Sequence, residues 1–181
     1  PLNRKNRTRL RRTVGYVMQH PERQLFADTV AEDVAYGPSN LGLDTSEAME
    51  RAMQAMRLLH IEHLRDRSPF DLSGGQQRLV AIAGVIACEP KALILDEPTA
   101  GLDEEAAARV HGLIHELKSR GVTILLISHS QDEVDELADR TIILGKPAKR
   151  ADSKESTEST VKATCEEEPD AESSVDAAGS D

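Results

Sequence analysis

Three residues in this sequence have the types and the order needed for phosphate chemistry. Asp96 and Glu97 end the apolar run 92–95, and His129 follows a second apolar run, residues 122–127. A carboxylate at the end of a buried strand suits a Mg²⁺ ligand, and a second one suits a general base that polarises an attacking water. His129 would contact the γ-phosphate and shift as it leaves. Together they predict machinery for ATP hydrolysis, with ATP and Mg²⁺ as cofactors.

A second cluster has the composition of a phosphate-binding turn. Its residues are Ser73, Gly74, Gly75 and Gln76, and a long apolar helical pattern follows them. Glycines without Cβ atoms let the backbone close on a phosphate, and a serine donates a hydroxyl. The positive end of the following helix is aimed at the same place. The cluster therefore predicts contact with a nucleotide phosphate.

The usual phosphate loop is missing from the sequence as it stands. No G-x-x-x-x-G-K-[ST] motif occurs, because the single Gly-Lys pair, Gly145-Lys146, has Arg140 in place of the first glycine and Pro147 after the lysine. The residues present make up half of a nucleotide site. We expect a chain that lacks the amino-terminal third of its domain.

These motifs resemble the ATP-binding-cassette ATPases over about residues 13–145. The matching segments are the signature (72–76), Walker B (93–97), the D-loop (100–103), the switch histidine His129 and the Q-loop glutamine Gln19. The resemblance implies an α/β fold of the P-loop NTPase class with a helical subdomain at about residues 27–88. It also implies nucleotide contacts from Gln19, residues 73–76 and Asp103, and Mg²⁺ contacts from Asp96 and Gln19. In that family two subunits sandwich ATP, so a second ATPase subunit, identical or different, is an implied partner.

Residues 19–26, 30–38 and 40–43 look like the ATPase subunits of energy-coupling-factor importers, which take up vitamins and transition metals such as cobalt. This resemblance implies a transmembrane coupling subunit as partner and a peripheral position on the cytoplasmic face of the cell membrane. Leu79 departs from it, because the family usually carries arginine there. Two alternatives remain open: a non-catalytic fragment that lends its signature to an intact ATPase, and a cassette protein with no transport role.

The charge of the chain is concentrated at its carboxyl end. The net charge is −10, but residues 151–181 hold ten acids and two lysines, so the rest is close to neutral at −2. A nucleic-acid-binding domain is expected to be strongly basic, so nucleic acid is excluded as a partner. Residues 146–181 have almost nothing to bury and are predicted to be a disordered acidic tail. Residues 1–12 are basic, and we interpret them as a solvated connector.

Apolar periodicity predicts alternating strands and helices. Asp44 and Glu47 have capping-box spacing before a helix in which Met49, Met53 and Met56 serve as core residues. Another helix follows the signature and ends near Cys88. The remaining predicted elements are a strand at 14–18, a buried strand at 92–95, a helix at 104–120 with Gly121 as its cap, a buried strand at 122–127 and a short strand at 141–144.

Two histidine pairs have one-turn spacing, as a metal site on a helix would have. They are His60 with His63 and His111 with His115. His111 is followed by glycine rather than by the glutamate of a zinc protease, and no third ligand is in view. We therefore interpret both pairs as solvated helix faces.

Overall fold

A computed structural model describes residues 4–144 of the chain. The chain divides into two compact units, residues 1–142 and 143–181. Of the second unit only Ile143 and Leu144 are described, and both are exposed and outside regular secondary structure. The predicted disordered tail, residues 146–181, lies outside the described residues. All elements discussed below belong to the first unit.

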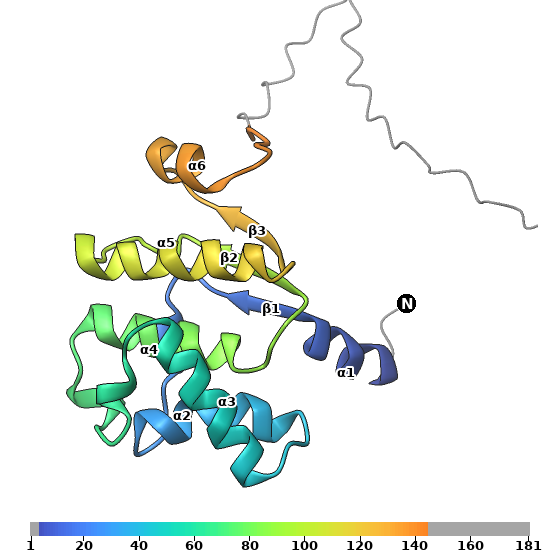
Figure 1. The fold of residues 1–181 in the computed structure, drawn as a ribbon, viewed down its shortest axis with the longest axis vertical. Coiled ribbons are helices and arrows are strands. Elements are labelled where there is room, and N and C mark those ends of the chain that lie inside the picture. Colours follow the sequence, from blue (N-terminus) through green and yellow to red (C-terminus); the bar gives the residue numbers. More distant parts are fainter. Residues whose placement is uncertain (1–3, 145–181) are drawn as a thin grey trace, which may run out of the picture. The chain divides into compact units, whose positions relative to one another are not determined.

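Three strands and six α-helices form the described fold, with three short 3₁₀ turns between them (Figure 1). The strands are β1 (Val14–Val17), β2 (Ala92–Asp96) and β3 (Thr123–Ile127). The helices are α1 (Arg4–Thr13), α2 (Val30–Asn40), α3 (Thr45–Leu58), α4 (Gly74–Ile86), α5 (Glu104–Ser119) and α6 (Gln131–Leu137). The 3₁₀ turns are η1 (Pro21–Gln24), η2 (Glu62–Leu64) and η3 (Pro69–Asp71).

The strands form one parallel sheet in the order β1-β2-β3. Val17 pairs with Leu95, and Leu95 pairs with Leu126, so the carboxyl ends of the three strands lie at one edge. One face of the sheet is covered, with α4 against β1 and α5 against β3. Val17, Leu93 and Leu95 are almost completely buried there. Burial of these aliphatic side chains is the main source of the sheet's stability.

The other face of the sheet is largely uncovered by the described residues. The register places Tyr16, Ile94 and Leu125 side by side on it. Tyr16 is 48% exposed, Leu125 55% and Ile127 45%. The prediction that strand 122–127 is buried is therefore wrong: three of its six side chains are exposed and the other three are only partly buried. Parallel sheets are normally covered on both faces, and helices of the described part cover only one.

Helices α2, α3 and α4 pack together to one side of the strands (Figure 1). The predicted cap of α3 is confirmed, because the Asp44 side chain accepts a hydrogen bond from the Glu47 N–H at 2.9 Å. Met56 is fully buried, whereas Met49 and Met53 are partly buried against the core. A Cβ atom on Gly37 of α2 would lie 2.6 Å from the Cys88 sulfur, so this glycine allows the close approach of α2 to the end of α4.

Residues 4–13 form helix α1, in which residues 9–12 are exposed, as those of a solvated connector would be. The prediction at the other end of the domain is wrong. Residues 141–144 form no strand, and Ile142 is 83% exposed. A strand needs a hydrogen-bonded neighbour, and within residues 4–144 β3 pairs only with β2. A short run of apolar and β-branched residues alone therefore gave a false strand prediction at residues 141–144.

The burial of the α3 methionines gives a direct test of this core. Met56→Ala should lower the free energy of unfolding by about 2–5 kcal/mol, because it leaves a cavity in a closed environment. Met49→Ala, in the same helix but only partly buried, should cost clearly less. Urea unfolding followed by circular dichroism measures both values. Equal losses for the two variants would contradict this description of the core.

Candidate functional site

Asp96 is the last residue of β2, at the carboxyl edge of the sheet. Its Oδ2 atom accepts a hydrogen bond of 3.2 Å from the hydroxyl of Tyr16 on β1. This hydrogen bond, with smaller contributions from burial and from the Asp96 charge, raises the pKa of Tyr16 above its usual value. Asp96 is therefore oriented from the neighbouring strand.

Glu97 and His129 meet at the same edge. The Nδ1 atom of His129 lies 2.6 Å from Oε1 of Glu97. The hydrogen bond to Glu97, followed by the carboxylate charge, raises the pKa of His129. The Glu97 side chain is 16% exposed, whereas that of His129 is 82% exposed. The contact therefore joins a partly buried carboxylate to a histidine that is open to solvent.

The backbone of Glu97 is in the left-handed region, with φ at +51°. A non-glycine residue in this conformation costs about 1–3 kcal/mol and persists only where its surroundings hold it. Here the Glu97 N–H donates to the Ile127 carbonyl at 2.9 Å, across to the end of β3. The strained turn thus fixes Glu97 beside the segment that carries His129.

The predicted phosphate-binding turn forms the start of α4. Ser73 is the N-cap, and it forms a capping box with Gln76: the Gln76 N–H donates to the Ser73 hydroxyl, and the Ser73 N–H donates to Oε1 of Gln76. A Cβ atom added to Gly74 would meet nothing within 4 Å, and one on Gly75 would meet only Leu102, at 3.6 Å. Neither glycine has a positive φ. The described fold therefore does not itself require glycine at these positions.

Arg78 links three of the candidate segments. The sequence analysis did not identify it as a site residue. It is 6% exposed and donates to the carbonyls of Gln19, at 2.8 Å, and of Ala100. Its Nε atom lies 3.5 Å from Oε2 of Glu22. Although burial raises the pKa of Glu22, its backbone hydrogen bond and the Arg78 charge lower it overall. An arginine within an apolar helical stretch was the sequence signal for this role.

Gln19 and Asp103 each have a structural contact of their own. Gln19 follows β1 at the carboxyl edge, and its carbonyl is held by Arg78. Asp103 is the N-cap of α5 and accepts from the Ala106 N–H at 2.8 Å. Asp103 thus stabilises a helix whether or not it also contacts a nucleotide.

The site residues form two groups. Asp96, Glu97 and His129 gather at the strand ends, while residues 73–76 lie next to Leu102 of the D-loop. Among residues 4–144, no hydrogen bond or ion pair joins the side chains of one group to those of the other. The two groups are therefore not linked directly through their side chains.

The carboxylates are compatible with Mg²⁺ bound together with a nucleotide. Among the described residues, no group of three or more His, Cys, Asp or Glu side chains could hold a metal ion by itself. Mg²⁺ commonly uses one or two protein carboxylates and completes its shell with phosphates and water. Asp96 at the strand end meets that requirement, with Glu97 beside it. Among the described residues, Gln19 forms no hydrogen bond or ion pair with Asp96. No direct contact therefore supports the prediction that Gln19 is a second Mg²⁺ ligand.

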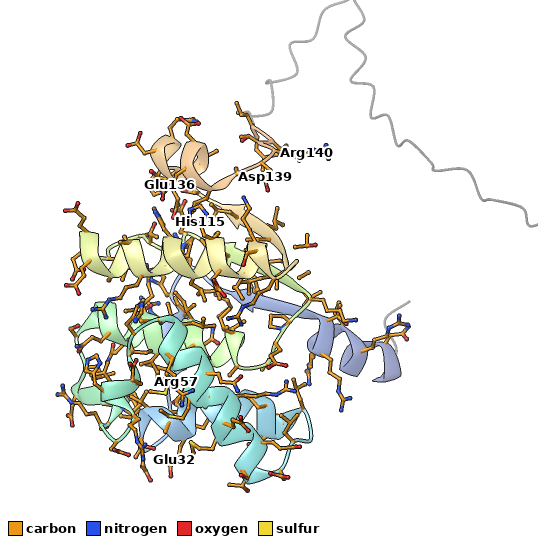
Figure 2. The ribbon with its side chains drawn as sticks, in the orientation of Figure 1. Glu32, Arg57, His115, Glu136, Asp139 and Arg140 are labelled. Carbon is orange, nitrogen blue, oxygen red and sulfur yellow. The ribbon has the colours of Figure 1, made fainter. Side chains whose placement is uncertain are left out.

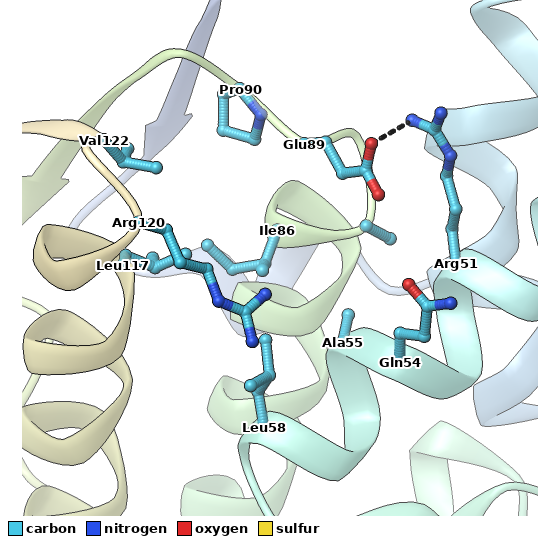
Figure 3. Close-up of a pocket in the computed structure, with 11 residues that line it drawn as sticks. Arg51, Gln54, Ala55, Leu58, Ile86, Glu89, Pro90, Leu117, Arg120 and Val122 are labelled. Carbon is cyan, nitrogen blue, oxygen red and sulfur yellow. Dashed lines mark ion pairs between the residues drawn. The ribbon is translucent and has the colours of Figure 1, made fainter.

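A separate pocket of about 250 Å³ lies between α3, α4 and α5 (Figure 3). It has an apolar floor that includes Leu58 and Ile86, and Arg51 and Glu89 form an ion pair of 2.9 Å at its rim. Pro90 and Val122 also line it and precede β2 and β3 in the sequence. The pocket is therefore at the amino ends of the strands, whereas ligands of parallel sheets bind beyond the carboxyl ends.

Comparison with known proteins decides the family. The family model described as ABC transporter matches residues 1–100. This chain belongs to the ABC transporter family. An ABC transporter ATP-binding protein of Bifidobacterium longum is 64% identical over 140 residues, which cover 77% of this chain and 18% of that protein. An energy-coupling factor transporter ATP-binding protein of Streptococcus thermophilus is 48% identical over 76% of this chain and 49% of that protein.

Solved structures support the same fold for this ABC transporter chain. The structure of cbiO1 from Clostridium perfringens, part of the ABC transporter complex cbiONQ, matches with a TM-score of 0.65 and 43% identity. That match covers 73% of this chain and 53% of the other. A dimeric bacterial ABC transporter cassette matches with a TM-score of 0.67 and 26% identity, over 75% of this chain and 60% of the other. The predicted fold class, the P-loop ABC ATPase fold, and the resemblance to the energy-coupling-factor type are thus confirmed.

The ABC transporter chain spans about half of the length of most of these relatives, and less of the Bifidobacterium protein. Within its described residues, no helix has both the length and the apolar character that crossing a membrane requires.

The contact between His129 and Glu97 predicts how the site responds to pH. Because the pKa of His129 is raised, the stability that the contact contributes is present below the ordinary histidine pKa and is lost as pH rises through the folded-state pKa. Glu97→Gln should lower the His129 pKa toward its ordinary value, as measured by NMR titration. An unchanged His129 titration in Glu97→Gln would contradict the contact.

Proposed function

We propose that this chain is the part of an importer ATPase subunit that supplies the catalytic carboxylates, the switch histidine and the signature motif. The reaction is the hydrolysis of ATP by water to ADP and phosphate, coupled to transport through a membrane partner. The observation that carries the proposal is the contact of 2.6 Å between Glu97 and His129 at the carboxyl edge of the sheet, next to Asp96.

Each of the three residues has a separate task in this proposal. Glu97 is the general base that takes a proton from the attacking water, because a carboxylate next to an imidazole is available as an acceptor. His129 orients that carboxylate and contacts the γ-phosphate from its exposed side. Asp96 holds Mg²⁺, which supplies electrostatic stabilisation of the phosphate charge when it is bound. The Tyr16 hydroxyl keeps the Asp96 carboxylate oriented.

The signature serves a nucleotide held by a second ATPase subunit. Its N–H groups are at the start of α4, where the helix dipole favours a phosphate. The glycines support this function, because neither has a positive φ that requires glycine and a Cβ would meet nothing at Gly74 and only an ordinary contact with Leu102 at Gly75. Without a Cβ atom, each lets a phosphate approach the backbone closely. The dimeric cassette among the similar structures supports pairing of two ATPase subunits.

A phosphate loop remains necessary for tight ATP binding, since its backbone N–H groups and lysine hold the phosphates. The apolar face formed by Tyr16, Ile94 and Leu125, together with the free edge of β3, is where an element carrying such a loop would pack. The exposure of Leu125 supports this position. So does the closeness of this face to Asp96, which projects from the same side of β2.

The membrane partner is proposed to contact the segment that follows Gln19. Phe26 and Tyr36 are 55% and 52% exposed there, with ring centroids 4.6 Å apart. Exposed aromatic residues are enriched in protein interfaces. Asp33 holds the turn by accepting from the N–H groups of Phe26 and Ala27. The chain would then be peripheral to the cytoplasmic face of the membrane.

The transported substrate is proposed to be a vitamin or a transition metal ion such as cobalt, on the resemblance to energy-coupling-factor ATPases. The rival function is a non-catalytic partner that lends its signature to an intact ATPase and hydrolyses nothing itself. The two functions differ in whether Glu97 is used, and the experiments below separate them.

The first experiment tests the signature in a reconstituted pair with an intact ATPase subunit. Gly75→Asp should abolish the partner's stimulated ATP hydrolysis, because it places bulk and negative charge where a γ-phosphate approaches. Gly112→Asp is the matched control, since Gly112 also lies in a helix with open space around its Cβ position but on α5. Turnover that is unchanged by Gly75→Asp would show that the signature is unused.

The second experiment tests Glu97 in a protein that joins this chain to a phosphate loop. Glu97→Gln keeps the size of the side chain but removes the base, so ATP hydrolysis should fall about 10²- to 10⁴-fold while nucleotide binding survives. Asp96→Asn should weaken Mg-ATP binding as well as turnover. Phosphate release and calorimetry measure the two effects. Parental turnover in Glu97→Gln would favour the non-catalytic rival.

A further inference from the structure

Glu133 is a buried charge that the proposed chemistry does not use. It is one of two charged side chains that are buried in residues 4–144, the other being Arg78. It lies in the first turn of α6 and is 4% exposed. Its Oε1 atom accepts a hydrogen bond of 2.8 Å from the Thr99 hydroxyl and lies 3.4 Å from Nε2 of His111. A carboxylate in such a place is costly unless it is held by partners of this kind.

Oε2 of Glu133 is buried and has no hydrogen-bond partner in the described part of the chain. The carboxylate therefore depends on Thr99 and His111 alone. His111 in turn contacts Glu136 through Nδ1, at 3.0 Å, and Glu136 is also 3.8 Å from His115. Figure 2 labels His115 and Glu136 where α5 faces α6. Glu133 is thus anchored to a loop and a helix at once.

The two anchored segments are the ones that carry the catalytic candidates. Thr99 follows Glu97 by two residues, and Glu133 follows His129 by four. The hydrogen bond between Thr99 and Glu133 therefore ties the segment after β2 to the segment after β3. The remaining side-chain link between those segments is the contact between Glu97 and His129. Because His129 is 82% exposed, its own ion pair holds it only weakly.

We propose that Glu133 is a positioning residue that, through Thr99 and His111, fixes the turn after β3 so that His129 lies against Glu97. Thr99 acts as the tether on the Glu97 side, and His111 holds the carboxylate from α5. We call the contacts of Glu133 with Thr99 and His111 the tether; they form in the protein without a bound nucleotide. The importance of the tether for ATP hydrolysis rests on the proposed function of Glu97 and His129.

The tether is tested on the 181-residue chain by NMR titration of labelled histidines, with the His129 signal assigned by its loss in His129→Asn. Thr99→Val removes the hydroxyl without changing any charge, so a change in the His129 titration reports position rather than lost charge. We expect the elevation of the His129 pKa to be largely lost in Thr99→Val and retained in Thr99→Ser. A purely structural role for Thr99 would shift the urea midpoint but not the His129 pKa.

His115→Gln is the matched control, because His115 lies one turn from His111 on α5 and contacts Glu136 rather than Glu133. It should leave the His129 titration unchanged. Thr99 is only partly buried, and Thr99→Ala gives the same test if valine disturbs folding. A folded Thr99→Val or Thr99→Ala chain with the parental His129 titration would overturn the tether. That outcome leaves the proposed ATPase function standing, which the Glu97→Gln turnover measurement tests independently.

Discussion

The parallel register of the three strands is the constraint on which the site depends. Because β1, β2 and β3 run in the same direction, their carboxyl ends meet at one edge, where Tyr16, Asp96 and His129 come together from strands far apart in the sequence. The left-handed turn at Glu97 uses this edge, since its N–H is taken by the end of β3. Local strain is thus held in place by the sheet, and it brings the carboxylate to the histidine.

Two buried charges connect this edge to the helices. Arg78 fixes the signature helix to the carbonyls of Gln19 and Ala100, while Glu133 fixes α6 to Thr99. A buried charge is costly to leave unpaired, so each tolerates little movement of its partners. The segments after β1 and β2 are thereby tied to the helices through these contacts. Their side chains can stay open to a nucleotide while their backbones stay in place.

The strands and helices that surround the site could be predicted because their signals are local. The cap at Asp44, the turn at Gly121 and the apolar run into Asp96 all lie where their patterns predicted. What failed depends on partners distant in sequence. The predicted strand 141–144 has no neighbour to pair with, and strand 122–127 is exposed on one face. Arg78 and Glu133 were missed because their importance comes from burial, which residue type does not reveal.

Two features, the uncovered face of the sheet and the glycines of the signature, bring no benefit to the described residues by themselves. Leu125 and Ile127 expose apolar surface to water, which is unfavourable for residues 4–144 by themselves. Nothing in the described backbone requires glycine at positions 74 and 75. An apolar layer packed on the sheet would bury Leu125 and Ile127, and a phosphate at the start of α4 would use the close backbone approach that glycine allows. Both features fit the proposed role of this chain as one contributor to a nucleotide site.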